Sequence, residues 1–525
     1  MSKKFASGAN LRQKILDGVN VLADNVASTL GPRGRNVIIH EKGKRPVITK
    51  DGVTVAKFIE FEDEFMNAGA QVVKQAAAKT NVDAGDGTTT STVLARAIFN
   101  AASDHIVDGS SAPIEIKRGI DKAVNAVNEL LLESARPIQS ADDVAHIATI
   151  SANGDEDIGN LVALAVDKVG KDGSITIEEA RSVDTSLDLM EGFRFDSGYA
   201  ATAFITDDRR GVVRYEDPIF LITDEKIETV DQILPALEVA ARESRPFVIV
   251  ADDIEGQALA ALIMNSMRGT MKVAAVKAPR YGEERRGIMS DLAISVGAKY
   301  FRRSAGDKLK EANLTDFGSA KTVEIEKGTT TVVGGNGNLE EVENRIDALK
   351  AEIEQTDSLH QAERVQDRVT RLASGVAVIR VGAATEIEMI EKKHRIEDAL
   401  EAVRSAQLEG VISGGGTALL MSSTKLVVDT ENEHQESGVD IVRRALQEPI
   451  RQMASNCGMD VEDTLQTITE ASNGMGINFA TGELVNMFDV GIIDPVKVTR
   501  SALRNAASVA GTLLTTNHAI IELED

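Results

Sequence analysis

The chain has 525 residues, of which 42% are hydrophobic, and its 58 lysines and arginines against 82 acids give a net charge of −24. This length predicts about three domains with sizeable apolar cores, and the negative charge disfavours nucleic acid or an anionic membrane as the main partner. The one cysteine, Cys457, allows no intrachain disulfide, and we interpret it as a small, buried residue. The N-terminus lacks the apolar run of a signal peptide, and no stretch reaches the ~18 apolar residues of a membrane span. We therefore expect a cytoplasmic protein.

The first stretch, residues 1–136, has the periodicity of a mostly helical region. One predicted helix carries its apolar residues on a single face, at Leu11, Ile15, Val19, Leu22 and Val26. It is expected to end at a Gly–Pro stop signal at residues 31–32. The elements expected next are a hairpin over residues 36–40 and 45–50 and helices over residues 67–80 and 88–102.

The middle of the chain alternates between short β-rich runs and helical patterns, which is typical of an α/β domain. The expected strands cover residues 174–180, 219–222, 247–251, 273–276 and 375–384, and the expected helices cover residues 157–169, 230–241, 257–267 and 386–410. A charged stretch at residues 339–372 predicts a helical hairpin. From Val411 the chain is helical again. Helical ends around an α/β centre predict a discontinuous outer domain with another domain inserted into it.

The hexapeptide GDGTTT at residues 85–90 is the strongest chemical signal, because it opens a predicted helix. Glycines let the backbone approach a ligand closely, and a helix N-terminus offers N–H groups and a positive dipole end to an anion. Asp86 is a carboxylate suited to Mg²⁺, which binds through one or two carboxylates and phosphate oxygens. The peptide therefore suits a magnesium–nucleotide phosphate, although no Walker A sequence occurs in the chain. A glycine turn followed by a threonine N-cap is the structural alternative.

Four further segments have residues suited to nucleotide contacts: TLGPRG from Thr29, TKDGVTVAK from Thr49, SGGGTALL from Ser413, and INFATGELVN with GIIDP from Ile477 to Pro495. In the second of these, a cation and a carboxylate stand before a glycine, and an Asp-Gly hairpin turn is the alternative. Asp398 lies on a charged amphipathic helix, where a solvated position is the alternative to a functional one.

Six motifs in order, GDGTTTSTVLARAI, TLGPRGRNVII, TKDGVTVAK, EKKHRIEDAL, SGGGTALL and DPVKVTRSALRNAASVAG, resemble those of group I chaperonins, the Hsp60/GroEL type. The resemblance covers residues 4–521, and the group II type is a poorer match because the α/β centre shows no inserted helical protrusion. It implies a multidomain α and α/β chaperonin subunit. Its expected domains are a helical equatorial ATP-binding domain (residues 1–136 and 411–525), a small α/β intermediate domain (137–191 and 376–410) and an α/β apical domain (192–375).

The resemblance also assigns roles to residues of the expected ATP site. The nucleotide contacts it implies are Thr29, Leu30, Gly31, Pro32, Lys50, Gly52, Asp86, Gly87, Thr88, Thr89, Thr90, Ile150, Gly414, Gly415, Asn478, Phe479, Ala480, Ile492 and Asp494. Asp86 is implied to hold Mg²⁺, with K⁺ as a further ion. Asp398 matches the catalytic aspartate, which would orient water from a moving domain, and Asp51 is a second catalytic carboxylate near the phosphates and metal.

The resemblance also implies a polypeptide-binding surface and a set of hinges. The residues implied to bind non-native polypeptides are Tyr199, Phe204, Leu234, Leu237, Leu259, Ile263 and Met264, and the implied hinges are Pro137, Gly192, Gly375 and Gly410. An exposed apolar surface of flexible side chains would suit promiscuous capture. Family members form seven-membered rings, so we expect a homo-tetradecamer or a single ring, with a co-chaperonin of the Hsp10 type as partner and no contact with nucleic acid or membrane.

The sequence also departs from the family. GYAATAF at residues 198–204 lacks a usual proline and second aromatic residue, Arg280 stands where glycine is typical, and Phe479 replaces a small residue beside the expected base. The chain ends in NHAIIELED where many members carry a Gly-Gly-Met-rich tail, and Arg451 and Asp460 match a charged inter-ring region. The alternatives to a folding chaperonin are a relative that holds chains with weak hydrolysis and a small-molecule kinase, for which no substrate acid/base group is evident.

Overall fold

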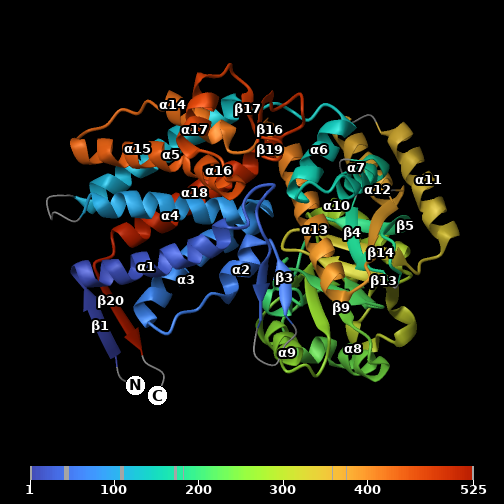
Figure 1. The fold of residues 1–525 in the computed structure, drawn as a ribbon. Coiled ribbons are helices and arrows are strands. Elements are labelled where there is room, and N and C mark those ends of the chain that lie inside the picture. Colours follow the sequence, from blue (N-terminus) through green and yellow to red (C-terminus); the bar gives the residue numbers. More distant parts are fainter. Residues whose placement is uncertain are drawn as a thin grey trace. The chain divides into compact units, whose positions relative to one another are not determined.

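The computed structural model describes residues 3–40, 46–106, 112–170, 174–180, 182–356, 359–373 and 375–522. The chain forms two compact units (Figure 1). The first unit contains Met1–Leu164, Arg181–Val183 and Val381–Asp525, and the second contains Ala165–Ala180 and Asp184–Arg380. The sequence predicted three domains; their boundaries fall within these two units and stay predictions. Among the described residues, no helix is long and apolar enough to cross a membrane.

The first unit is mainly helical. Its helices are α1 (Gly8–Ala27), α2 (Gly52–Phe58), α3 (Glu64–Ala84), α4 (Thr88–Asp104), α5 (Pro113–Glu133), α6 (Ala141–Ser151), α13 (Glu386–Glu409), α14 (Thr417–Lys425), α15 (Glu433–Ala445), α16 (Glu448–Cys457), α17 (Val461–Glu470) and α18 (Val496–Leu514), while α7 (Glu156–Val169) crosses the boundary. Its strands form the two-stranded pairs β1 (Lys3–Ser7) with β20 (His518–Glu522), β2 (Val37–Ile39) with β3 (Val47–Thr49), β16 (Val411–Ser413) with β19 (Ile493–Pro495), and β17 (Met475–Asn478) with β18 (Glu483–Asn486).

The core of the first unit confirms the predicted apolar face of the first helix, since Leu11, Ile15, Val19, Leu22 and Val26 are all buried. Helices α1, α3, α4 and α18 pack together, so the C-terminal part of the chain lies beside the N-terminal part (Figure 1). At Gly18, a Cβ atom would lie 2.2 Å from the Met66 carbonyl oxygen of α3, so only glycine permits this close approach of α1. The predicted hairpin is confirmed as the antiparallel pair β2–β3.

The second unit is built on a large mixed sheet, several strands of which are labelled in Figure 1. The strand order is β11-β9-β7-β13-β14-β5-β15-β4, and in addition β12 pairs with β7 and β6 with β13. These strands are β4 (Ser174–Glu179), β5 (Ser186–Phe195), β6 (Val213–Glu216), β7 (Ile219–Thr223), β9 (Phe247–Ala251), β11 (Val273–Lys277), β12 (Tyr300–Phe301), β13 (Gly318–Ile325), β14 (Thr330–Gly335) and β15 (Gly375–Val381), with β8 (Lys226–Ile227) and β10 (Asp253–Ile254) as a separate pair. The helices are α8 (Val230–Glu243), α9 (Gly256–Met267), α10 (Gly282–Val296), α11 (Leu339–Gln355) and α12 (Leu359–Ala373), and short 3₁₀ turns include η1 (Thr202–Phe204).

The parallel part of the sheet, β7, β9 and β11, consists of almost wholly buried strands. This is the pattern of a sheet covered on both faces, and it explains the short continuous apolar runs in the sequence. The predicted helical hairpin is confirmed as α11 and α12. Arg280 has a φ of +58°, in the region that favours glycine, which gives a physical reason for the glycine typical of this position.

The four predicted hinge residues lie beside strand pairings. Gly410 has a φ of +80° and its Cβ would meet the Arg136 carbonyl oxygen at 2.5 Å, directly before Pro137. Gly192 lies inside β5, where a Cβ would meet the Val376 side chain at 2.2 Å, and Gly375 is the first residue of β15. The glycines at 410 and 192 are therefore required by close packing, and the movement at these positions stays a prediction.

Candidate functional site

One cavity of about 790 Å³ in the first unit collects residues from distant parts of the chain. All the sequence-predicted contacts of the nucleotide site line it, together with Asp51 and Asp398, with one exception. The exception is Gly414, whose N–H donates to the Ile492 carbonyl oxygen (2.9 Å) beneath the lining; Gly415 and Gly416 face the cavity instead. The structure thus brings the predicted residues together in one cavity.

The turn between α3 and α4 presents a helix N-terminus to this cavity. Gly85 and Gly87 have φ values of +73° and +82°, and Cβ atoms there would meet Glu401 at 2.2 Å and Val498 at 2.7 Å. Gly87 is itself the N-cap of α4, without a side-chain cap, so the alternative of a threonine N-cap is wrong. The N–H groups of the first turn of a helix have no intrahelical acceptor, and they suit an anion.

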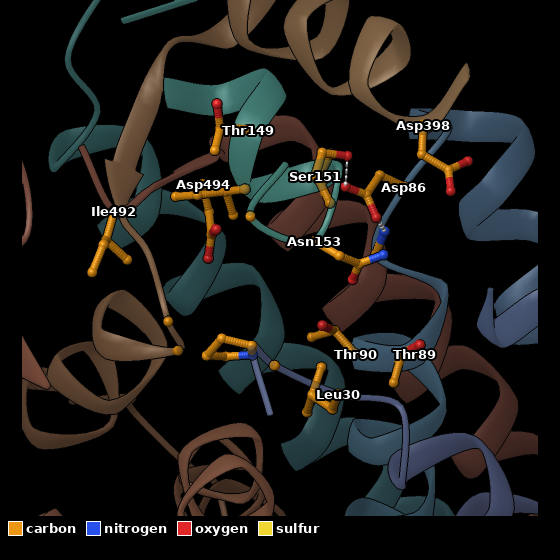
Figure 2. Close-up of a pocket in the computed structure, with 18 of the residues that line it drawn as sticks. Leu30, Asp86, Thr89, Thr90, Thr149, Ser151, Asn153, Asp398, Ile492 and Asp494 are labelled. Carbon is orange, nitrogen blue, oxygen red and sulfur yellow. Dashed lines mark hydrogen bonds between the residues drawn. The ribbon is translucent and has the colours of Figure 1, made fainter. Parts of the chain in front are cut away.

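Asp86 is held between that turn and α6. Its Oδ1 accepts from the Gly87 N–H (2.5 Å) and its Oδ2 from the Ser151 hydroxyl (2.8 Å) (Figure 2). The carboxyl keeps some surface toward the cavity but is crowded by protein, and this desolvation raises its pKa, an effect to which the negative charge of Asp51 adds. A carboxylate in such a place is stabilised by a cation.

Asp494, from β19, is a second carboxylate of the same cavity (Figure 2). Burial first, and then repulsion by Asp86, raise the pKa of Asp494 to about 7. The carboxylate oxygens of Asp86 and Asp494 are ligands of the kind that Mg²⁺ prefers, and its positive charge would offset their unfavourable negative charges. Within the described part of the chain, no three His, Cys, Asp or Glu side chains are grouped to hold a metal, so phosphate and water would complete its coordination.

Lys50, Asp51 and Gly52 meet the cavity where α2 begins. Burial lowers the pKa of Lys50, against the opposing effect of Glu391. Asp51 is the N-cap of α2, where its carboxylate accepts from the N–H groups of Val53 (3.2 Å) and Thr54 (3.0 Å). The alternative of an Asp-Gly hairpin turn is therefore wrong, and the helix α2 was missed because it is only seven residues long.

Asp398 lies on the face of α13 that lines the cavity, with Glu391, His394 and Arg395 (Figure 2 shows Asp398). Arg395 donates to Asp155 Oδ2 (2.6 Å), after the end of α6, and to Glu391 Oε2 (3.0 Å). Asp398 therefore lies at the cavity, and its catalytic role stays a prediction.

Phe479 belongs to a hydrophobic cluster with Leu420, Ile450 and Leu465 and is 4% exposed. The Cys457 thiol donates to the Phe479 carbonyl oxygen (3.4 Å), and Cys457 itself is partly rather than fully buried. The large ring therefore packs within the protein at this edge of the cavity, which accounts for how it is accommodated there.

Sequence reasoning missed several lining residues: His146, Thr149, Ser151, Asn153 and His394. Only Ile150 was assigned from the segment TISANGDEDIG, although Asn153 and Gly154 of the turn after α6 also line the cavity. A signal was present in Asn153 and Gly154, a pair typical of positive φ, which have φ values of +61° and +85°.

The predicted polypeptide-binding surface of the second unit is only partly exposed. Leu234 is 43% and Met264 46% exposed, and Met267, which was not predicted, is 72% exposed. Tyr199, Leu259 and Ile263 pack partly against the core. The prediction was wrong for Phe204, which is fully buried, and for Leu237, which is 8% exposed, because both side chains fill the core beneath the helices.

The fold over the whole chain is the mixed α and α/β fold of a chaperonin subunit. It is similar to the crystal structure of the chaperonin gp146 from the bacteriophage EL 2 (Pseudomonas aeruginosa), determined in the presence of ATP-BeFx, with a TM-score of 0.67 and 22% identity over 99% of each chain. At this identity the likeness concerns the fold. The model of the TCP-1/cpn60 chaperonin family matches residues 22–524, and the chain therefore belongs to this family.

Proposed function

We propose that this protein is an ATP-dependent folding chaperonin of the group I type. The observation that carries the proposal is the meeting, in one cavity, of a helix N-terminus, a lysine and several carboxylates from segments far apart in the sequence. Phosphoryl transfer needs positioning and charge stabilisation more than covalent chemistry, and this set of groups supplies both.

Different residues of the cavity bind the phosphates, orient the attacking water and hold the metal ion. The first turn of α4 and Lys50 bind phosphate oxygens, and Asp398 accepts a hydrogen bond from the attacking water and orients it. Asp86 would hold Mg²⁺, with Asp494 nearby. When bound, Mg²⁺ neutralises charge on the phosphate oxygens.

Capture of non-native chains is assigned to the exposed apolar side chains of α8 and α9, Leu234, Met264 and Met267. Unbranched methionine side chains adapt to many partners, which suits chains without a fixed sequence. The expected assembly is a homo-oligomer of seven-membered rings, and a co-chaperonin of the Hsp10 type is the expected second partner.

The experiment combines native mass measurement with Mg²⁺-dependent ATP hydrolysis. We expect a ring-sized particle, and in Asp398→Asn a loss of hydrolysis of at least ~100-fold with ATP still bound. Asp347→Asn, which changes an exposed acid of α11 with 78% of its side chain accessible, is the matched control and keeps full activity. A monomer without ATPase activity would refute the proposal.

A refolding assay separates folding from passive holding. With a denatured enzyme as substrate, ATP is expected to give a higher refolding yield than a non-hydrolysable analogue. Equal yields would instead indicate a relative that holds chains.

A further inference from the structure

Ser151 is the last residue of α6, and its hydroxyl is the side-chain donor to the Asp86 carboxylate. The Ser151 Oγ lies 2.8 Å from Asp86 Oδ2, while the other carboxylate oxygen accepts from the backbone of Gly87 (Figure 2). One of these bonds comes from the turn that carries Asp86, and the other comes from a helix that is distant in sequence.

The position of the Ser151 hydroxyl is set by a well-defined helix. At its start, α6 has a capping box in which Ser140 and Asp143 bond reciprocally (3.1 Å each). At its end, the N–H of Ala152 donates to the Ala148 carbonyl oxygen (2.9 Å), and the N–H of Gly154 donates to the Thr149 carbonyl oxygen (2.8 Å). Because hydrogen bonds fix both ends of α6, the backbone of Ser151 has little freedom to move.

Two hydrogen bonds leave room on Asp86 for a metal ion. An ionised carboxylate has about four acceptor directions, and Gly87 and Ser151 use two of them. They fix the plane of the carboxylate, so the remaining directions are set before a cation arrives. Hydrogen bonds of this kind to metal-binding carboxylates typically change metal affinity or activity by about 10–100-fold.

We propose that Ser151 is a positioning residue that orients Asp86 for the divalent cation of the bound nucleotide. This inference rests on the proposed function, because it takes Asp86 as the carboxylate that holds Mg²⁺. It adds a role for α6, the helix that packs against the Asp398-bearing helix α13. A displacement of α6 would release the hydroxyl from Asp86 and weaken the hold on the metal.

The test compares Ser151→Thr with Ser151→Val, which have the same shape and differ in the hydroxyl. ADP binding is measured by calorimetry during Mg²⁺ titration, so that no hydrolysis is needed. In Ser151→Val the Mg²⁺ concentration required for tight ADP binding should rise about 10-fold or more, while Ser151→Thr stays close to the unchanged protein. ADP affinity in excess chelator should be equal in all of them, because Ser151 acts through the metal carboxylate.

Two controls sharpen the result. Ser422→Ala removes a buried hydroxyl that donates to a carbonyl of its own helix, Ala418 (2.8 Å), and should leave the Mg²⁺ dependence unchanged. In an Asp86→Asn background, Ser151→Val should add no further loss. Ser151→Ala is the second hydroxyl-free variant if valine prevents folding.

An unchanged Mg²⁺ dependence in the hydroxyl-free variants, with Mg²⁺-dependent ADP binding intact, would overturn this inference alone. A loss that appears equally in chelator would also overturn it, since it would place the role of Ser151 in general structure. Absence of ADP binding in the unchanged protein would overturn the proposed function as well.

Discussion

Asp494 and Asp86 are two carboxylates of one cavity, and the negative charge of Asp86 helps to raise the pKa of Asp494 to about 7. Burial is the larger cause, and the N–H of Gly415 opposes it only in part. Without a cation, the folded protein therefore holds a proton on Asp494 more tightly than the unfolded chain does. The stability of the ligand-free protein should depend on pH for this reason.

Folding raises the pKa of Asp494, so the protonated form of Asp494 favours the folded protein. The raised pKa contributes stability below the unfolded value of 3.8, and this contribution is lost as pH rises through about 7. Asp494→Asn removes the ionisation, so its free energy of unfolding should exceed that of the unchanged protein at pH 8, by at most about 4 kcal/mol. Urea unfolding at pH 5 and pH 8 in chelator measures the effect, with Asp347→Asn as control. A difference that does not grow with pH would contradict the prediction.

Asp51 combines two roles that substitution can separate. Its carboxylate caps α2 through Val53 and Thr54 and also lines the cavity. Asparagine and serine cap helices about as well as aspartate, whereas alanine costs about 1 kcal/mol. We expect Asp51→Asn to keep the thermal stability and to lose ATPase activity, and Asp51→Ala to lose the activity together with about 1 kcal/mol of stability. Activity retained in Asp51→Asn but not in Asp51→Ala would limit Asp51 to the cap.

The candidate site was predictable where its chemistry is local. Gly85 and Gly87 occupy positive φ positions that their turn requires, so GDGTTT could be recognised from neighbouring residues alone. The Ser151–Asp86 contact joins residues that are not neighbours in the chain, and no local pattern marks it. The short pair β16–β19 was missed for the same reason, since each strand has three residues and its partner is distant in sequence.

Exposure was the least predictable property of the second unit. Leu234 and Leu237 lie one helical turn apart, and apolar periodicity gives both the same signal. The structure exposes the first and buries the second in the apolar core of the second unit. A stripe of apolar residues therefore locates a helix face but does not reveal which part of that face is covered.

The different exposure of Leu234 and Leu237 can be tested by substitution. Leu234→Ser and Met264→Ser remove exposed apolar groups, so stability should change by no more than about 0.5 kcal/mol while capture of a denatured test protein falls. Leu237→Ser opens a gap in the core and should lower stability by at least ~2 kcal/mol. Light scattering of the aggregating test protein reports capture, and chemical unfolding reports stability. Full capture by the Leu234→Ser, Met264→Ser double variant would remove these side chains from the binding surface.

Glu324 of β13 is a buried carboxylate held by two arginines. Its Oε1 accepts from Arg210 (2.7 Å) and its Oε2 from Arg214 (3.3 Å), and Arg214 also donates to the Ile177 carbonyl oxygen of β4. Breaking a buried ion pair leaves a charge without its partner, which typically costs about 3–5 kcal/mol. Because Arg214 keeps Glu178 nearby, at 3.7 Å, we place the cost of Glu324→Gln at the lower end of that range.

The exposed pair Lys350–Asp347 on α11 is the matched comparison, with a separation of 3.8 Å and both side chains well exposed. Asp347→Asn should change stability by no more than about 0.5 kcal/mol, because solvent screens such pairs. Hydrogen exchange of the β13 and β6 amides localises the effect, since these strands pair directly. Faster exchange there in Glu324→Gln, but not in Asp347→Asn, is the expected result. Equal exchange in both variants would mean that the arginines find other partners and that the buried carboxylate contributes little to the stability of this sheet.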